Sequence, residues 1–217
     1  MDQAVVIGAL ALVGAAWGFA ADRLAARWPS HEDGSIRPVD WRTPLVVLVG
    51  AVAAPLVVER YATLPTALLV LGIYVAALVV LLATDLDQRL LPDVITLPLI
   101  GLAAIVLASG SSIFIRTNDD VLWAVGASIV VPAGLYALSI PFGRGAIGQG
   151  DLKLLVSVGL LTGSTNLVYA LIGGALLAGI VVGALLFVRR ISLKTYVPYG
   201  PFLIAGILWV ILGLPQT

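Results

Sequence analysis

Two acidic side chains at the edges of apolar runs are the residues of this sequence best suited to chemistry. Asp151 follows the glycine-rich stretch "GAIGQG", and Asp85 follows the unbroken run "LLAT". Ionisable groups at such depths are costly next to lipid, and by default they indicate a functional site. The alternative to a functional role for Asp85 is that its charge only marks the membrane boundary, because charged residues are common at the ends of spanning helices.

Two carboxylates that face each other across a helical bundle could hydrolyse an amide. The ionised one takes a proton from water, and the protonated one hydrogen-bonds to the substrate and protonates it. Like charges a few ångströms apart cannot both ionise cheaply, so such a pair shares a proton. Asp85 closes an expected helix and Asp151 opens one. Because the negative end of a helix dipole disfavours a carboxylate, we expect Asp85 to keep the proton more readily.

Three charged neighbours have simpler explanations. Asp87 lies two residues after Asp85, so on a continuing helix the two carboxylates point to nearly opposite sides. Asp93 follows a proline and precedes an apolar run, which is typical of a helix N-cap. Lys153 is expected to extend its ammonium group to the lipid surface.

Glycines surround the approach to Asp151. This residue could itself cap a helix that begins at Leu152. Gly145, Gly148 and Gly150 remove side chains near its carboxylate and permit the close approach of another backbone. A hydrolase that acts on a peptide needs such room, so the glycines favour a functional interpretation of Asp151.

Composition identifies the class of protein that must position these groups. Of the 217 residues, 60% are hydrophobic and 11% are charged, which is typical of a polytopic membrane protein and not of a soluble domain. A net charge of zero gives no reason to expect nucleic-acid binding. The absence of cysteine excludes disulfides, thiolate metal sites and cysteine nucleophiles, and His31 is the only histidine. We therefore expect neither a metal nor a cofactor.

The apolar runs predict an all-α bundle of about eight transmembrane helices in a single domain, residues 1–217. Helices are the only sensible interpretation, because each backbone polar group in lipid needs an internal partner. The break near Gly163 is weak, so seven helices are the alternative. The runs are 4–21, 44–58, 64–84, 94–110, 121–141, 152–163, 166–188 and 200–214.

Basic residues predict the orientation of the bundle. With eight helices, ten of the twelve fall in loops on one side, and only Arg60 and Arg116 fall on the other. The positive-inside rule makes the ten-residue side cytoplasmic, with both termini outside and all four candidate aspartates at the cytoplasmic face. The ten are Arg23, Arg27, Arg37, Arg42, Arg89, Arg144, Lys153, Arg189, Arg190 and Lys194.

The remaining acidic residues are interpreted as ordinary surface charge. Glu59 adjoins Arg60 at a helix end, where a local ion pair is expected. The others lie in expected polar loops or at the terminus, and solvation explains them: Asp2, Asp22, Glu32, Asp33, Asp40, Asp119 and Asp120.

Three segments resemble one known family and occur in its order. "GQGD" followed by "LKLL" is similar to the GxGD signature of intramembrane aspartyl proteases, "TDLDQRLLPDVITLPLI" to the first aspartate segment, and "YVPYGPFLIAG" to a segment near the C-terminus. Together they resemble the type IV prepilin peptidase family over about residues 64–214. The resemblance implies that Asp85 and Asp151 are the catalytic pair and that Gly148 and Gly150 are the motif glycines.

The resemblance also implies a substrate and a location. The family cleaves the basic leader of type IV pilins and pseudopilins at the cytoplasmic face of the inner membrane, just before the hydrophobic stem helix. Bifunctional members carry cysteine pairs in the first cytoplasmic loop and methylate the new N-terminus. Here that loop, about residues 22–43, is short and lacks cysteine, so we expect a peptidase without the methyltransferase. The substrate, its pathway and the oligomeric state stay open.

Two other functions fit part of the pattern. A transporter would also use intramembrane carboxylates and glycine-rich breaks. Against it, both candidate aspartates are expected at one face of the membrane, and the sequence has no paired halves. An inert scaffold for assembly in the same membrane is the third interpretation.

Overall fold

Eight α-helices make up nearly all of the chain that the computed structural model describes, residues 2–30, 34–142, 147–190 and 199–213. A single 3-10 turn, Ile140–Phe142, follows the fifth helix, and these ranges contain no strand. The expected all-α fold and the count of eight are therefore confirmed. The helices are α1 Gln3–Ala25, α2 Arg42–Tyr61, α3 Pro65–Gln88, α4 Asp93–Ala108, α5 Asn118–Ser139, α6 Gln149–Thr162, α7 Ser164–Phe187 and α8 Gly200–Gly213.

The lengths of the helices divide them into two groups. By length and composition, α1, α2, α3, α5 and α7 are each able to cross a membrane. The other three have 14 to 16 residues, and of these α4 and α8 are strongly apolar. The chain is an integral membrane protein in which helices long enough to span a membrane pack with shorter ones.

Two breaks between helices follow from single residues. Arg89 has a φ of 57°, and its backbone N–H donates to the Asp85 carbonyl at 2.9 Å, which ends α3. Pro92 then precedes α4. Gly163 has a φ of +86°, a conformation that favours glycine, and it separates α6 from α7. The break that seemed weak in sequence is therefore a true helix boundary.

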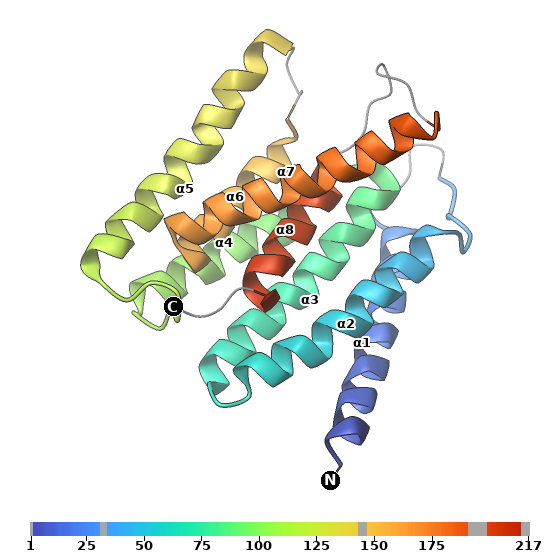
Figure 1. Ribbon diagram of the computed structural model, residues 1–217, viewed down its shortest axis with the longest axis horizontal. Coiled ribbons are helices and arrows are strands. Elements are labelled where there is room, and N and C mark those ends of the chain that lie inside the picture. Colours follow the sequence, from blue (N-terminus) through green and yellow to red (C-terminus); the bar gives the residue numbers. More distant parts are fainter. Residues whose placement is uncertain (1, 31–33, 143–146, 191–198, 214–217) are drawn as a thin grey trace.

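Helix α3 lies in the middle of the bundle (Figure 1). On one side α1 and α2 pack closely along each other, because glycines face backbone there: a Cβ on Gly18 would lie 2.8 Å from Val47 Cα. On the other side lie α4 to α7, with α8 between α3 and α7. The buried Tyr74 hydroxyl of α3 hydrogen-bonds to the Ser157 hydroxyl of α6 at 2.6 Å, so the two helices that carry the candidate aspartates are joined inside the core.

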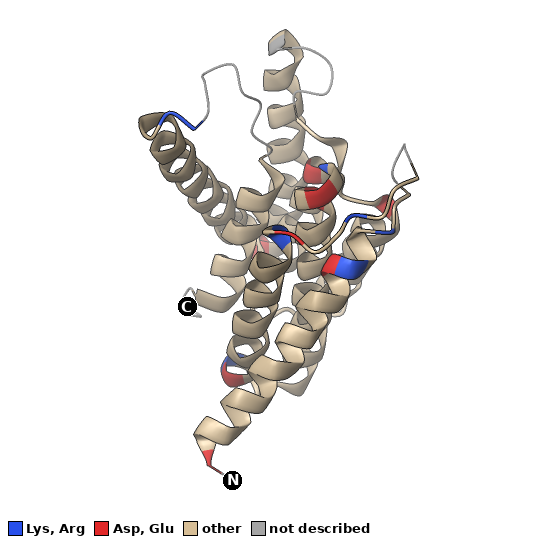
Figure 2. Cartoon of the chain, turned by 90° about the vertical axis from the view of Figure 1, so that its right-hand side faces the viewer, with Lys and Arg blue, Asp and Glu red and all other residues tan. Residues whose placement is uncertain are grey.

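The charged residues are unevenly distributed along the bundle. Figure 2 shows that most of those visible from one side gather away from the start of α1, near the segment that joins α1 to α2. Two of the basic residues used for the orientation lie outside the described residues, so the predicted topology stays a prediction. These are Arg144 and Lys194; His31, Glu32, Asp33 and Gly145 also lie outside them.

Candidate active site

Asp85 and Asp151 line the same cavity, of about 240 Å³. Asp85 belongs to the last turn of α3, and Asp151 is the third residue of α6. Their carboxylates are near enough for the two charges to interact. Residues 66 positions apart in the chain are thus brought to one site, because the end of one helix meets the start of another.

Both carboxylates carry a buried oxygen without a hydrogen-bond partner among the described residues, Oδ2 of Asp85 and Oδ1 of Asp151. Asp85 is 5% exposed, and Asp151 is partly buried. An unsatisfied buried polar group costs about 1–3 kcal/mol, and more when it is charged. Such atoms are rare in folded proteins, and they are expected where a ligand or a reaction requires them. These unsatisfied oxygens make Asp85 and Asp151 the candidate pair for binding or chemistry.

Glycines allow the chain to close around the two carboxylates. A Cβ on Gly150 would lie 2.6 Å from the Cβ of Leu91, so α6 can approach the turn after α3 only with glycine there. A Cβ on Gly148 would lie 3.1 Å from Oδ2 of Asp151. Gly200, the first residue of α8, lies against Asp85, and its Cβ would be 2.6 Å from Cγ of that carboxylate.

Gly200 is a site residue for which the sequence provided no role. The available signal was the Gly-Pro pair that opens the last apolar run, within the segment "YVPYGPFLIAG". Tyr196, Val197 and Pro198 of that segment lie outside the described residues.

Three helix N-termini converge on this cavity. Asp93 opens α4, Gln149 opens α6, and both line the cavity, while Gly200 at the start of α8 lies against Asp85. A helix N-terminus carries a partial positive charge, so each of these ends favours a nearby anion. The last turn of α3 instead presents its negative end to Asp85.

The roles expected for Asp93 and Lys153 are wrong. Pro92 and not Asp93 is at the N-cap position of α4, and Gly148 and not Asp151 at that of α6, so neither aspartate caps its helix. Lys153 does not extend to lipid: its Nζ lies 2.6 Å from Oδ1 of Asp93. This exposed pair joins α4 to α6 at the rim of the cavity, because Asp93 opens α4 and Lys153 lies near the start of the neighbouring α6.

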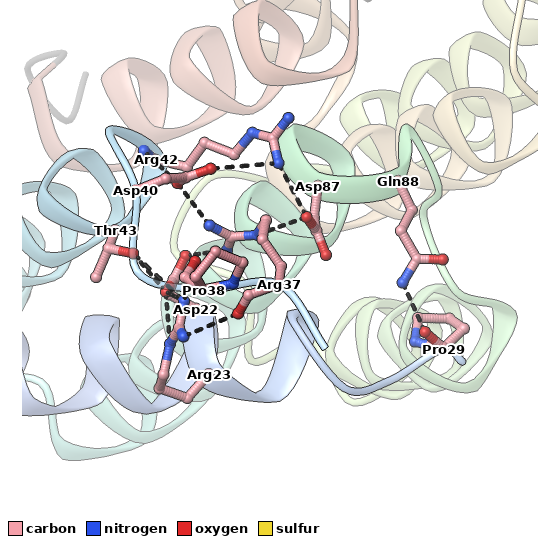
Figure 3. Close-up of polar contacts among 10 residues, drawn as sticks. All are labelled: Asp22, Arg23, Pro29, Arg37, Pro38, Asp40, Arg42, Thr43, Asp87 and Gln88. Atoms are coloured by element: carbon pink, nitrogen blue, oxygen red, sulfur yellow. Dashed lines mark hydrogen bonds and ion pairs between the residues drawn. The ribbon is translucent and has the colours of Figure 1, made fainter. Parts of the chain in front are cut away.

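Asp87 does not line the aspartate cavity and belongs to a separate ionic network (Figure 3). Its Oδ1 lies 2.6 Å from Nε of Arg37 and 3.1 Å from Nη1 of Arg42. The next residue, Gln88, donates to the carbonyl of Pro29 at 2.6 Å. The segment between α1 and α2 is therefore fastened to the last turn of α3, the turn that carries Asp85.

Asp22 is the buried centre of this network, which corrects its interpretation as a solvated charge. It is 0% exposed, and it accepts from Arg37 at 2.5 Å and from the hydroxyl of Thr43 at 2.8 Å. Arg23 also donates to it. Asp22 lies within α1, and Arg37 and Pro38 lie against the end of that helix, so the carboxylate is enclosed rather than hydrated.

Arg37 links the two buried carboxylates. Burial by itself would lower the pKa of Arg37, but the hydrogen bond to Asp22 and the charges of Asp22, Asp87 and Asp40 raise that pKa above its usual value. The guanidinium therefore stays charged at every physiological pH. The sequence could not predict that Arg37 bridges Asp22 and Asp87, because this contact depends on how the segment between α1 and α2 folds against the helices.

The pair expected between Glu59 and Arg60 is also absent from the described ion pairs. Arg60 donates instead to the hydroxyl of Tyr61 and to the carbonyl of Leu212. Within the described ranges, no three carboxylate or imidazole side chains come together in a group that could hold a metal ion.

Comparison with known proteins connects this site to a family. The model of the type IV leader peptidase family matches residues 72–184, a range that includes both aspartates. A prepilin leader peptidase/N-methyltransferase of Pseudomonas putida is 34% identical over 173 residues, which cover 79% of this chain and 59% of that protein. Proteins of the same name from Aeromonas hydrophila and Dickeya chrysanthemi are 32% and 34% identical, over 82% and 81% of this chain and 60% and 62% of theirs.

The chain spans about three fifths of the length of these relatives. No solved structure matches it significantly. The family model covers more than half of the chain, and its match contains all of α4, α5 and α6 and the part of α3 that carries Asp85. This chain is therefore a member of the type IV leader peptidase family.

Proposed function

We propose that the chain is a membrane-embedded aspartic endopeptidase that removes the basic leader from type IV prepilins or pseudopilins. The observation that carries the proposal is the pair of buried carboxylates, Asp85 and Asp151, each with an unsatisfied oxygen, in one cavity. Membership of a leader peptidase family supplies the reaction class. The names of the relatives refer to prepilin leaders, which supports the substrate class.

The pair can perform hydrolysis without another catalytic group. One ionised carboxylate takes a proton from water while the water oxygen bonds to the scissile carbonyl carbon, and the protonated carboxyl hydrogen-bonds to the carbonyl oxygen. The carbon–nitrogen bond then breaks, and the leaving nitrogen receives a proton from the pair. Asp85, at the negative end of α3, is the proposed proton donor to the carbonyl, and Asp151, near the positive end of α6, is the proposed base.

We place this reaction at the cytoplasmic face of the inner membrane, within a single membrane domain over 1–217. The ten-to-two division of basic residues favours that orientation, with both termini outside. Arg89, Asp93 and Lys153 line the cavity and give it a polar rim, as expected for an opening near the membrane surface. A substrate stem helix in the bilayer would present its leader junction to this rim.

The proposal is limited to peptide cleavage. The relatives' names also include N-methyltransferase, but the 22–43 segment here is short and has no cysteine, and Arg37 within it serves the buried ionic network. The transporter alternative is not supported, since the family and its named relatives are peptidases.

Cleavage by purified protein tests the proposal. A prepilin with its leader is incubated with the wild type, Asp85→Ala and Asp151→Ala, and loss of the leader is measured by mass spectrometry. Each variant should be slower by roughly 10²–10⁴-fold, the usual contribution of a general acid or base. Asp119→Ala, an exposed carboxylate in the first turn of α5, is the matched control and should cleave normally. Full activity in either of the first two variants would exclude the proposed pair.

A further inference from the structure

The last turn of α3 is held by residues that lie outside the aspartate cavity. Oδ1 of Asp87 lies 2.6 Å from Nε of Arg37 and 3.1 Å from Nη1 of Arg42, and the side-chain amide of Gln88 donates to the Pro29 carbonyl at 2.6 Å (Figure 3). None of these five residues lines the cavity. Their contacts therefore act on the helix that carries a candidate catalytic group, and not on the space where a substrate would bind.

This turn depends on support from its surroundings. Helix ends fray, because their last carbonyl groups lack partners within the helix. Arg89 ends α3 with a φ of 57°, a conformation that is costly for residues other than glycine and persists only where neighbouring structure holds it. Oδ2 of Asp85 has no hydrogen-bond partner among the described residues. Since no hydrogen bond fixes this oxygen, its place is set by the backbone of the turn.

Arg37 is able to fix this backbone because it is itself firmly held. Its Nη2 lies 2.5 Å from Oδ1 of Asp22 in α1, and its Nη1 lies 2.6 Å from Oδ1 of Asp40. The side chains of Asp22 and Asp87 are 0% and 1% exposed, so water does not compete for these contacts. A guanidinium group is a planar, rigid donor of several hydrogens. Arg37 thus joins α1 to the turn that carries Asp85.

We propose that Arg37 and Asp87 are positioning residues, whose ion pair holds the last turn of α3 so that the Asp85 carboxylate stays aligned with Asp151. The inference rests on the proposed peptidase function and adds residues that set its rate without touching the substrate. A misplacement of about 1 Å can lower the rate of a reaction about 100-fold, even when the mutation is far from the chemistry. Loss of the pair should therefore lower kcat, and KM should not change, because the pair lies outside the cavity.

Two variants that each remove a buried polar contact test the inference. Asp87→Asn keeps the shape of the side chain and removes its charge, while Arg37 retains Asp22 and Asp40 as partners. Tyr61→Phe is the matched control: it removes a buried hydroxyl that donates to the Ile211 carbonyl at 2.5 Å, at the opposite end of α2 from Arg42. Removal of the leader from a prepilin gives kcat and KM, and thermal unfolding in detergent gives the stability of each protein.

A positioning role predicts that rate and stability separate. Asp87→Asn should lower kcat by about tenfold or more at an unchanged KM, whereas Tyr61→Phe should lose stability and keep its kcat. Arg37→Lys retains the charge and should keep a higher kcat than Arg37→Met. If Arg37→Met does not fold, Asp87→Asn and Arg37→Lys decide.

Two results would overturn the positioning role. One is a wild-type kcat in Asp87→Asn, and the other is a kcat that falls in proportion to stability in every variant, Tyr61→Phe included. If instead the wild type cleaves no prepilin, the peptidase function itself fails.

Discussion

Replacing Gly200 by alanine should inactivate the protein without unfolding it. The added Cβ would lie 2.6 Å from Cγ and 2.8 Å from Oδ1 of Asp85, whereas ordinary contacts of a Cβ begin at 3.4 Å. Either the carboxylate or the start of α8 must therefore move by about 0.8 Å. A misplacement of about 1 Å can cost a hydrolytic site about 100-fold in rate. We expect Gly200→Ala to lower kcat by roughly that factor, because the bond and the two carboxylates lose their alignment.

The assay is leader removal at saturating prepilin, together with thermal unfolding in detergent. Gly72→Ala is the matched control: Gly72 lies on α3, the helix that carries Asp85, and a Cβ there meets nothing within 4 Å. This control should retain its kcat, and its helix should if anything gain stability, since alanine is favoured over glycine by about 1 kcal/mol in a helix. A Gly200→Ala protein with wild-type kcat would refute the proposed contact between α8 and the site.

Two further substitutions separate buried from exposed charge pairs. Arg37→Met leaves Asp22 and Asp87, 0% and 1% exposed, without their shared partner, so we expect a loss of about 3–5 kcal/mol of stability. Thermal unfolding in detergent measures this loss. Arg37→Lys should lose less stability than Arg37→Met, because its positive charge remains. Equal stability of the wild type and both variants would contradict the network. Lys153→Met breaks the ion pair with Asp93, whose side chain is 59% exposed. Because exposed ion pairs contribute little, stability should change by less than about 1 kcal/mol. A large loss in the same measurement would mean that this pair holds α4 against α6.

The helices were predictable because their signal is local. A run of apolar residues has to form a helix in lipid, whatever its neighbours are, and each expected run corresponds to one observed helix. Asp85 and Asp151 line one cavity. The sequence predicted both at helix ends on the same face of the membrane but left open whether they meet without substrate. Their catalytic roles remain a proposal.

Partners of charged residues were not predictable in the same way. The pair between Arg37 and Asp22 spans 15 positions and that between Lys153 and Asp93 spans 60, so each depends on how helices pack. Asp22 was interpreted as solvated because its neighbours in sequence are polar, yet the following segment folds over it. The role of Gly200 likewise exists only because the start of α8 lies against α3.

The short helices around the aspartates have a consequence for the surrounding bilayer. At 1.5 Å per residue, α6 and α8 are about 21 Å long and α4 about 24 Å, while the hydrocarbon core of a typical membrane is about 30 Å thick. Lipid next to such segments adapts by thinning. We therefore expect headgroups to dip toward the carboxylates, which would shorten the route of water into the proposed hydrolytic site.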